Sequence, residues 1–404
     1  MPRFEPFAAL RYRESIDLDV VTAPPYDVID DHQRAVLAAR SPYNAVRVEL
    51  PVDDDGCDRY QVAARLLATW MDEGVLMADE SPSFFLYRMG FTDEHGRVRQ
   101  TSGVIGALEL SVPGEGDVLP HEQTTPRAKS DRLALLQATG CNLSPIWCLS
   151  PAKGLAQLVE PSGPPLARCT DESGTHHRLW AVSAPALIGA ISALVASAPL
   201  VIADGHHRYE TALALRQLRE RAGAGPGAHD LIMALVVELT ESELAVRAIH
   251  RLLGGLPREV DVVTSWAPLF EARPVTTGPA DLLELLAPAG SLGLVLADGS
   301  SWLLRPRPGA FPDDLPDLDA ARVEHARQLL PPHEVTYHHN HAAAVAGVGS
   351  TEGAVAVMLR PATVAQIAAT AERGECMPAK TTYFHPKPRT GMVFRSIDPP
   401  MGSL

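Results

Sequence analysis

The ten residues 201–210, VIADGHHRYE, predict a buried strand that turns abruptly into a helix. Apolar and β-branched residues end at Ala203, Asp204 is a typical helix N-cap residue, and Gly205 permits a tight turn with close backbone approach. The free N–H groups and the dipole at the start of a helix attract an anion. The segment therefore predicts an α/β unit with a phosphate or carboxylate site at the turn.

The side chains of this turn suggest chemistry as well as binding. Arg208 lies one turn into the predicted helix, where its planar fork can reach a phosphate or carboxylate. His206 and His207 project about 100° apart, so one can face a ligand while the other packs inward. We assign Asp204, His206 and His207 to catalysis and Gly205 and Arg208 to phosphate binding. The alternative is a capped helix whose histidines are incidental.

A second polar cluster lies between residues 120 and 132. His121 and Glu122 are adjacent, and an imidazole beside a carboxylate is a plausible acid–base pair or part of a metal site. Lys129 and Arg132 follow and can neutralise a polyanion. The segment HEQTT lacks the HExxH spacing of zinc proteases. A solvated polar loop is the alternative.

The chain is poor in lysine, since its 35 basic residues divide into 31 arginines and four lysines. Lysine offers a compact ammonium where arginine offers a wide fork, so the remaining lysines are candidates for sites that arginine cannot serve. Lys380 and Lys387 lie in the segment 377–388, where Thr381 and Thr382 add hydroxyl groups. We assign Lys380, Thr381 and Thr382 to phosphate binding. The alternatives are chance and a plain C-terminal tail.

A fourth cluster lies near the N-terminus. Two prolines fix an extended loop before Tyr26 and Asp27, and Asn44 follows in a second polar stretch that reaches Glu49. We assign Asp27, Asn44 and Tyr209 as candidate substrate-binding residues. Structural turn roles explain Asp27 and Asn44 equally well.

Composition excludes several classes of protein. A formal net charge of −14 argues against a general nucleic-acid or membrane-surface binder. The five cysteines are an odd number and no pair has CxxC spacing, which favours a reduced, cytoplasmic protein. The longest apolar run, 185–203, contains Pro199 and predicts a buried helix followed by a strand, not a membrane span. Histidines 338, 339 and 341 resemble a metal cluster but also match a helix start.

Strands and helices alternate along the chain. The pattern predicts strands at 45–50, 84–87, 104–110 and 231–239, helices at 58–73 and 206–222, and a hairpin over 292–304. A helix capped by Ser130 is expected to end before Gly140. The class is α/β, or α+β, with a mixed sheet and flanking helices. We expect a catalytic core over 1–240 and a C-terminal α/β region over 241–404, whose segment 375–390 returns to the active site.

The assembled motifs resemble a large bacterial and archaeal family of uncharacterised proteins, a "domain of unknown function" family. The matching segments are APPYDVI (23–29), SPYNAVRVEL (41–50), HEQT with the following K-DR (121–132), ADGHHRYETA (203–212) and MPAKTTYFHPKP (377–388). They come in the family's order and cover nearly the whole chain.

The DGHHR segment also resembles that of the free serine kinases of the ParB/sulfiredoxin superfamily, in which this box binds nucleotide phosphates. That resemblance implies a ParB/sulfiredoxin-like core, with Asp204, His206, His207 and Arg208 at the phosphate and substrate site. Glu122 would then correspond to the kinase's catalytic glutamate. The region after about residue 240 has no counterpart in that superfamily.

These observations favour a nucleotide-dependent phosphotransferase acting on a small hydroxylated metabolite, with free L-serine as the best single candidate. Transfer would depend on positioning and charge neutralisation, with ATP or ADP as donor and Mg²⁺ near Glu122 or Asp204. Two alternatives remain: a ParB-like nucleotide-binding switch, and a phosphohydrolase that uses the same pocket. We expect neither nucleic acid nor membrane as a partner.

Overall fold

The computed structural model describes residues 2–54, 56–93, 96–112, 114, 116–120, 126–158, 160–276, 278, 281–373 and 377–398, with only the backbone for 120, 126–129, 371 and 372. The chain divides into two compact units. The first comprises Met1–Leu244 and Pro386–Leu404, and the second comprises Ala245–His385. The first unit thus ends at Leu244 and resumes at Pro386.

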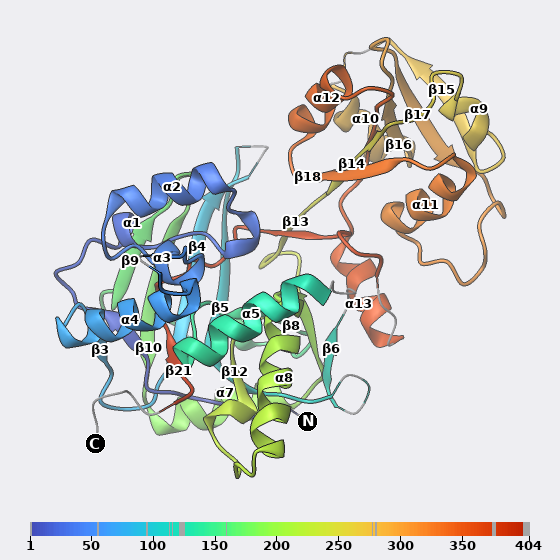
Figure 1. The fold of residues 1–404 in the computed structure, drawn as a ribbon. Coiled ribbons are helices and arrows are strands. Elements are labelled where there is room, and N and C mark those ends of the chain that lie inside the picture. The colour runs from blue at the N-terminus through green and yellow to red at the C-terminus, as the bar shows by residue number, and fades with distance from the viewer. Residues whose placement is uncertain are drawn as a thin grey trace. The chain divides into compact units, whose positions relative to one another are not determined.

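A mixed sheet forms the centre of the first unit, which confirms the predicted fold class (Figure 1). Among the described residues it has the strand order β6-β11-β8-β12-β5-β4-β10-β9, with β1 paired to β5. Strands β6 and β11 are parallel, as are β8 and β12, and the other neighbours are antiparallel. The bounds are β1 Phe4–Glu5, β4 Phe84–Thr92, β5 Val98–Glu109, β6 Val118–Pro120, β8 Ile146–Ser150, β9 Ala167–Thr170, β10 His176–Val182, β11 Leu200–Asp204 and β12 Leu231–Glu238.

The central strands of this sheet are covered on both faces, because every residue of β8 and β12 is buried. Helix α8 packs on β8 and β12 and against α5, while α7 packs on β1 and against α6. Pro185 opens α7, as the missing N–H of proline favours. The helices of this part are α5 Pro126–Thr139, α6 Leu155–Leu158, α7 Pro185–Ala196, α8 His206–Arg221 and the 3₁₀ turn η2 Ala228–Asp230.

The N-terminal residues form a second, smaller core beside the sheet. Trp70 and Leu67 of one helix pack there with Val46 and with Phe394, which comes from the C-terminal segment. The elements are α1 Leu18–Val21, η1 Tyr26–Val28, α2 Asp31–Arg40, α3 Val46–Glu49 and α4 Arg59–Asp72, with the strand pairs β2 Leu10–Tyr12 with β3 Leu76–Ala78, and β7 Cys141–Asn142 with β21 Arg395–Ser396.

The second unit has its own sheet and its own cores. In the part of it that the structure describes, six strands have the order β15-β17-β16-β19-β14-β18, and β13 pairs separately with β20. The hairpin predicted over 292–304 is confirmed as β16 and β17. The bounds are β13 Ala245–Arg247, β14 His250–Gly254, α9 Val262–Trp266, β15 Phe270–Val275, α10 Leu282–Ala289, β16 Leu292–Val295, β17 Ser301–Pro306, α11 Asp319–Ala326, η3 Arg327–Leu329, β18 Glu334–His338, α12 His341–Ser350, β19 Val355–Met358, α13 Val364–Glu372 and β20 Tyr383–His385.

Two local predictions were wrong. The predicted strand 45–50 instead contains the short helix α3, Val46–Glu49. Ala45, Val46 and Val48 are all buried, and the Asn44 Oδ1 accepts from the Val46 N–H at 2.9 Å. Ser130 lies inside α5, which begins at Pro126, and so does not cap it. The expected end of that helix is confirmed, since Gly140 follows it with φ 56°.

Candidate functional site

The turn between β11 and α8 has the predicted strand–glycine–helix form but a different cap. The strand runs through Asp204, the helix starts at His206, and Gly205 occupies the N-cap position with φ 94°. No side chain caps this end of the helix, so the prediction that Asp204 does so was wrong. His206 is buried and His207 is half-buried, consistent with their pointing in different directions. The N-cap position of α8 is thus held by a glycine and not by a carboxylate.

The Asp204 carboxylate instead joins two cations. Its Oδ2 accepts from Arg208 Nη2 at 2.8 Å, and its Oδ1 accepts from Lys387 Nζ. Lys387 also donates to Asp27 Oδ2 at 3.2 Å. We call Asp27, Lys387 and Asp204 the bridged carboxylate pair, because one ammonium joins two carboxylates from segments far apart in the sequence. Burial disfavours the charge on Lys387, but Asp204 and Asp27 outweigh it and raise the pKa of Lys387.

The C-terminal segment reaches this place through backbone pairing. Ala23 and Thr390 exchange two hydrogen bonds, of 3.0 and 2.9 Å, which align the segment with the double-proline loop before Asp27. The buried Arg389 side chain donates to the Thr22 carbonyl at 2.9 Å and to Glu172 Oε2 at 3.0 Å. These contacts place Lys387 beside Asp27, since only two residues separate it from Thr390.

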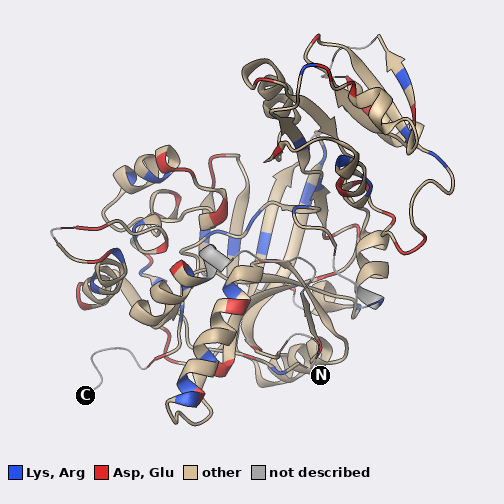
Figure 2. Ribbon diagram, turned by 45° about the vertical axis from the view of Figure 1, so that its right-hand side comes forward, with Lys and Arg blue, Asp and Glu red and all other residues tan. Residues whose placement is uncertain are grey.

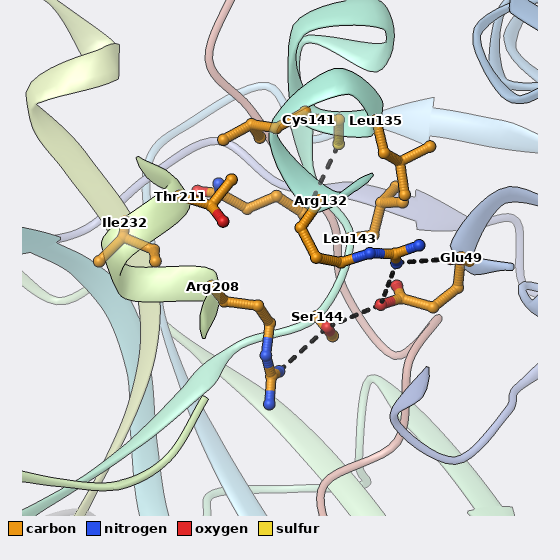
Figure 3. Close-up of a pocket in the computed structure, with 11 residues that line it drawn as sticks. Glu49, Arg132, Leu135, Cys141, Leu143, Ser144, Arg208, Thr211 and Ile232 are labelled. Atoms are coloured by element: carbon orange, nitrogen blue, oxygen red, sulfur yellow. Dashed lines mark hydrogen bonds and ion pairs between the residues drawn. The ribbon is translucent and has the colours of Figure 1, made fainter. Parts of the chain in front are cut away.

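A chain of polar contacts extends from Arg208 into the protein (Figure 3). Arg208 Nη1 donates to Ser144 Oγ at 3.0 Å, and Ser144 Oγ donates to Glu49 Oε1 at 3.4 Å. Arg132 Nη1 lies 3.9 Å from Glu49 Oε1 and donates to the Glu49 carbonyl at 2.8 Å. Burial raises the pKa of Glu49, although Arg132, Arg208 and the Ser144 hydrogen bond act in the opposite direction. The two arginines predicted to bind phosphate therefore hold a buried carboxyl between them.

Tyr26 packs against Arg132 of this cluster. The Arg132 guanidinium lies 4.5 Å from the centre of the Tyr26 ring, within the range of a cation–π contact. Arg132 also donates to the Asp131 carboxylate at 2.8 Å. Burial raises the pKa of Tyr26 to about 12, so its hydroxyl stays protonated at neutral pH.

A cavity of about 50 Å³ lies behind Arg208, lined by Glu49, Arg132, Leu135, Leu136, Cys141, Asn142, Leu143, Ser144, Arg208, Thr211 and Ile232 (Figure 3). Ligand pockets for small molecules span about 300–1,000 Å³, so this space is too small for a nucleotide. Three of its buried polar atoms have no partner among the described residues: Glu49 Oε2, Arg208 Nε and Thr211 Oγ1. The space is thus small, partly open and lined mainly by apolar surface, and it is not a nucleotide pocket.

Two of the three candidate substrate-binding residues, Asn44 and Tyr209, make hydrogen bonds that hold the fold together. Asn44 is fully buried, and its amide donates to the Val20 carbonyl at 2.7 Å while its oxygen accepts from Val46. The Tyr209 hydroxyl is equally occupied, accepting from the Ser111 N–H at 2.8 Å and donating to the Ser111 carbonyl at 2.9 Å. We therefore correct both assignments to structural roles. Asp27 alone of the three is partly exposed at the site, with a side-chain exposure of 30%.

The threonines and lysine at 380–382 belong to the second unit, whose boundary is His385. Lys380 is exposed and has φ 60°, which among the described residues is the one positive φ outside glycine. Its carbonyl accepts from Arg251 Nη2 at 2.9 Å, and Thr381 Oγ1 donates to the Pro378 carbonyl at 2.6 Å. Their assignment to the phosphate site stays a prediction, because they lie in a different unit from Asp204.

Other predicted residues lie outside what the structure describes. His121 and Glu122 are in the segment 121–125, which is not described, and of Lys129 only the backbone in α5 is described. Strand β6 ends at Pro120, which pairs with Ile202 of the parallel strand β11. Among the described residues, no group of three or more His, Cys, Asp or Glu side chains is placed to hold a metal ion, and this includes the histidines at 338, 339 and 341.

Two residues of this cluster, Lys387 and Ser144, have no role assigned from the sequence. Lysine scarcity is the signal that could have identified Lys387. Ser144 gives no such signal, because serine in a Pro-containing loop is common and its contact with Arg208 spans 64 residues.

Basic and acidic residues are both spread over the chain (Figure 2). Ion pairs of opposite sign recur along α8, as between Arg216 and Glu220 at 2.8 Å. Within the described part of the chain, no helix is long and apolar enough to cross a bilayer.

Comparison with solved structures gives several distant likenesses. A conserved hypothetical protein from Pyrococcus furiosus matches with 13% identity and a TM-score of 0.36, covering 69% of this chain and 90% of that chain. A free serine kinase in complex with AMP matches with 13% identity and a TM-score of 0.37, covering 66% and 83%. SbnI with C-terminal truncation, from Staphylococcus aureus, matches with 11% identity and a TM-score of 0.39, covering 71% and 85%. At this distance none of them carries an argument about chemistry.

The sequence itself identifies the family. No curated protein matches it significantly. A family model described as "Protein of unknown function (DUF1015)" matches residues 4–325, which include the β11–α8 turn and the segment around Asp27. The chain therefore belongs to the DUF1015 family of proteins of unknown function.

Proposed function

We propose that the first unit is a nucleotide-dependent phosphotransferase whose acceptor is a small hydroxylated metabolite, with free L-serine as the leading candidate. The observation that carries the proposal is the alternation of charge at the β11–α8 turn. Two carboxylates, Asp27 and Asp204, meet two cations, Lys387 and Arg208, next to a helix start without a side-chain cap. A zwitterionic amino acid presents the complementary pair of charges, and an uncapped helix start favours phosphate.

The positions of the described side chains suggest a role for each residue in the proposed reaction. Asp27 is the most exposed member of the cluster and would receive the substrate ammonium. The acceptor hydroxyl would attack the terminal phosphorus of the nucleotide, its proton passing to Asp204 or Glu122, and the nucleotide would leave shortened by one phosphate. The start of α8, with His206 and His207, would face the transferred phosphoryl group. ATP or ADP is the proposed donor, in keeping with the resemblance of the DGHHR segment.

Mg²⁺ does not fit the described residues at Asp204. Both oxygens of that carboxylate already accept from cations, Oδ1 from Lys387 and Oδ2 from Arg208. A metal ion bound there would lie next to two positive charges, so we assign Asp204 no metal-binding role.

A thermal-shift screen tests binding. ATP, ADP, CTP and pyrophosphate are each added with and without Mg²⁺ and L-serine to the full chain. We expect ATP or ADP to stabilise the protein and serine to add to the effect, because a ligand at a hundredfold excess over Kd contributes about 2.7 kcal/mol, or roughly 5–10 °C. Stabilisation by CTP with a dependence on DNA would favour the ParB-like switch, and stabilisation by none of these compounds would contradict the proposal.

Replacing Asp204 tests the site itself. Asp204→Asn removes the proposed proton acceptor while keeping its size, so we expect phosphoryl transfer to fall at least about a hundredfold. Asp72→Asn is the matched control, because Asp72 is an exposed residue at the end of α4. Equal activity of the two variants would remove Asp204 from the mechanism.

A further inference from the structure

The bridged carboxylate pair is arranged as a cation site that the protein fills itself. Lys387 Nζ lies 3.2 Å from Asp27 Oδ2 and is also hydrogen-bonded to Asp204 Oδ1, and the Lys387 side chain is 10% exposed. Two carboxylates that converge on one point from different segments form the kind of oxygen-rich site that a divalent cation uses. Here the point of convergence holds an ammonium.

Lysine suits this position better than the arginine that dominates the rest of the chain. An ammonium is a compact charge with three rotatable donors, whereas a guanidinium is a wide planar fork. Only four of 35 basic residues are lysines, and one of them lies between these carboxylates. The backbone pairing of Ala23 with Thr390 fixes the segment that carries it.

We propose that the Lys387 ammonium is the resident cation of the Asp27–Asp204 pair and excludes a divalent metal from it. If the proposed function holds, it follows that any Mg²⁺ used in phosphoryl transfer arrives bound to the nucleotide phosphates. The carboxylates then serve the substrate and the proton, while Lys387 sets the local charge balance. Without Lys387, Asp27 and Asp204 would face each other with Arg208 as the nearest cation of the cluster.

The test is a titration of the full chain with Mn²⁺ alone. Electron paramagnetic resonance measures the concentration of free Mn²⁺ at each point and so gives the amount bound. We expect Lys387→Met to gain one site that binds Mn²⁺ at least about tenfold more tightly than wild type, because a like charge has been removed from beside it. Adding Asp27→Asn to that variant should abolish the gain. Lys387→Arg should show no gain, since it keeps the positive charge, and neither should Lys153→Met, which alters an exposed lysine elsewhere.

Two results would overturn the proposal. One is Mn²⁺ binding by wild type that Asp27→Asn removes, and the other is a folded Lys387→Met variant without the new site. Because no nucleotide or serine is present, these outcomes are independent of whether the protein transfers phosphate.

A spectroscopic measurement covers the case in which Lys387→Met does not fold. Lysine labelled with ¹³C at Cε gives signals from only four residues, and the Lys387 signal is assigned by its absence from the Lys387→Arg variant. In wild type, stoichiometric Mn²⁺ should leave that signal sharp, and Asp27→Asn should lower its titration midpoint. Paramagnetic broadening of the Lys387 signal by stoichiometric Mn²⁺ would contradict the proposal.

Discussion

At the residue scale, the buried imidazole of His250 in β14 links the stability of the second unit to pH. Its Nδ1 accepts from the Leu359 N–H at 3.2 Å, which requires the neutral ring. Burial lowers the pKa of His250 to about 4, and the positive charges of His341, Arg251, His338 and His339 act in the same direction. The folded state therefore binds a proton at His250 only at a lower pH than the unfolded chain does.

This difference predicts the direction of acid destabilisation. Between pH 6.5 and about 4 the unfolded chain binds a proton at His250 that the folded unit does not, so stability falls as pH falls through that window. The full effect is about 3 kcal/mol. Hydrogen exchange of the Leu359 amide between pH 7 and 4.5 would measure it.

The His250→Asn variant keeps an acceptor but cannot titrate, so its exchange should depend less on pH. His32→Asn serves as the control, because His32 is an exposed residue of α2. An unchanged pH dependence in His250→Asn would assign the acid sensitivity to other groups.

At the element scale, the junction of β11 and α8 depends on one glycine. A Cβ at Gly205 would lie 2.9 Å from Ile146 Cγ2 and 3.1 Å from the Arg208 Nε and Nη2 atoms. The backbone there has φ 94°, a conformation that L residues rarely adopt. Gly205 therefore both shapes the turn and leaves room for the guanidinium that holds Asp204.

We predict that Gly205→Ala destabilises the first unit by more than about 1–2 kcal/mol, the cost of the left-handed backbone alone. Gly189→Ala is the matched control. Gly189 lies in the exposed part of α7, with no atom within 4 Å of an added Cβ, so the change should stabilise the helix by about 0.5–1 kcal/mol. Denaturant unfolding of the two variants measures both effects, and similar midpoints for the two would contradict this reading of the turn.

Elements fixed by local pattern were predictable from the sequence. The strand, glycine and helix at 200–221 follow from apolar periodicity and turn chemistry within that one segment. The error at 45–50 has a tertiary cause, since packing on several sides made a short helix of a stretch whose residues favour a strand. The cap at the start of α8 was also mispredicted, because Asp204 pairs with Lys387, a residue that local reasoning does not bring near.

At the scale of the whole molecule, the site is assembled from distant segments. Lys387 and Asp27 are 360 residues apart, and Lys387 and Asp204 are 183 apart. The chain returns to the first unit at Pro386, so the lysine comes immediately after the return. The motifs indicated which segments matter, but their juxtaposition depends on the topology of the whole sheet and on the Ala23–Thr390 pairing, which no local pattern encodes.

The proposed transfer of phosphate by the first unit to a small hydroxylated acceptor can be followed by ³¹P nuclear magnetic resonance of the full chain with ATP or ADP, Mg²⁺ and L-serine. We expect a new phosphomonoester signal coupled to the serine methylene protons. It should grow as the donor loses its terminal phosphate and be absent with Asp204→Asn. Release of inorganic phosphate alone, or a donor left unchanged across a panel of hydroxylated acceptors, would contradict it.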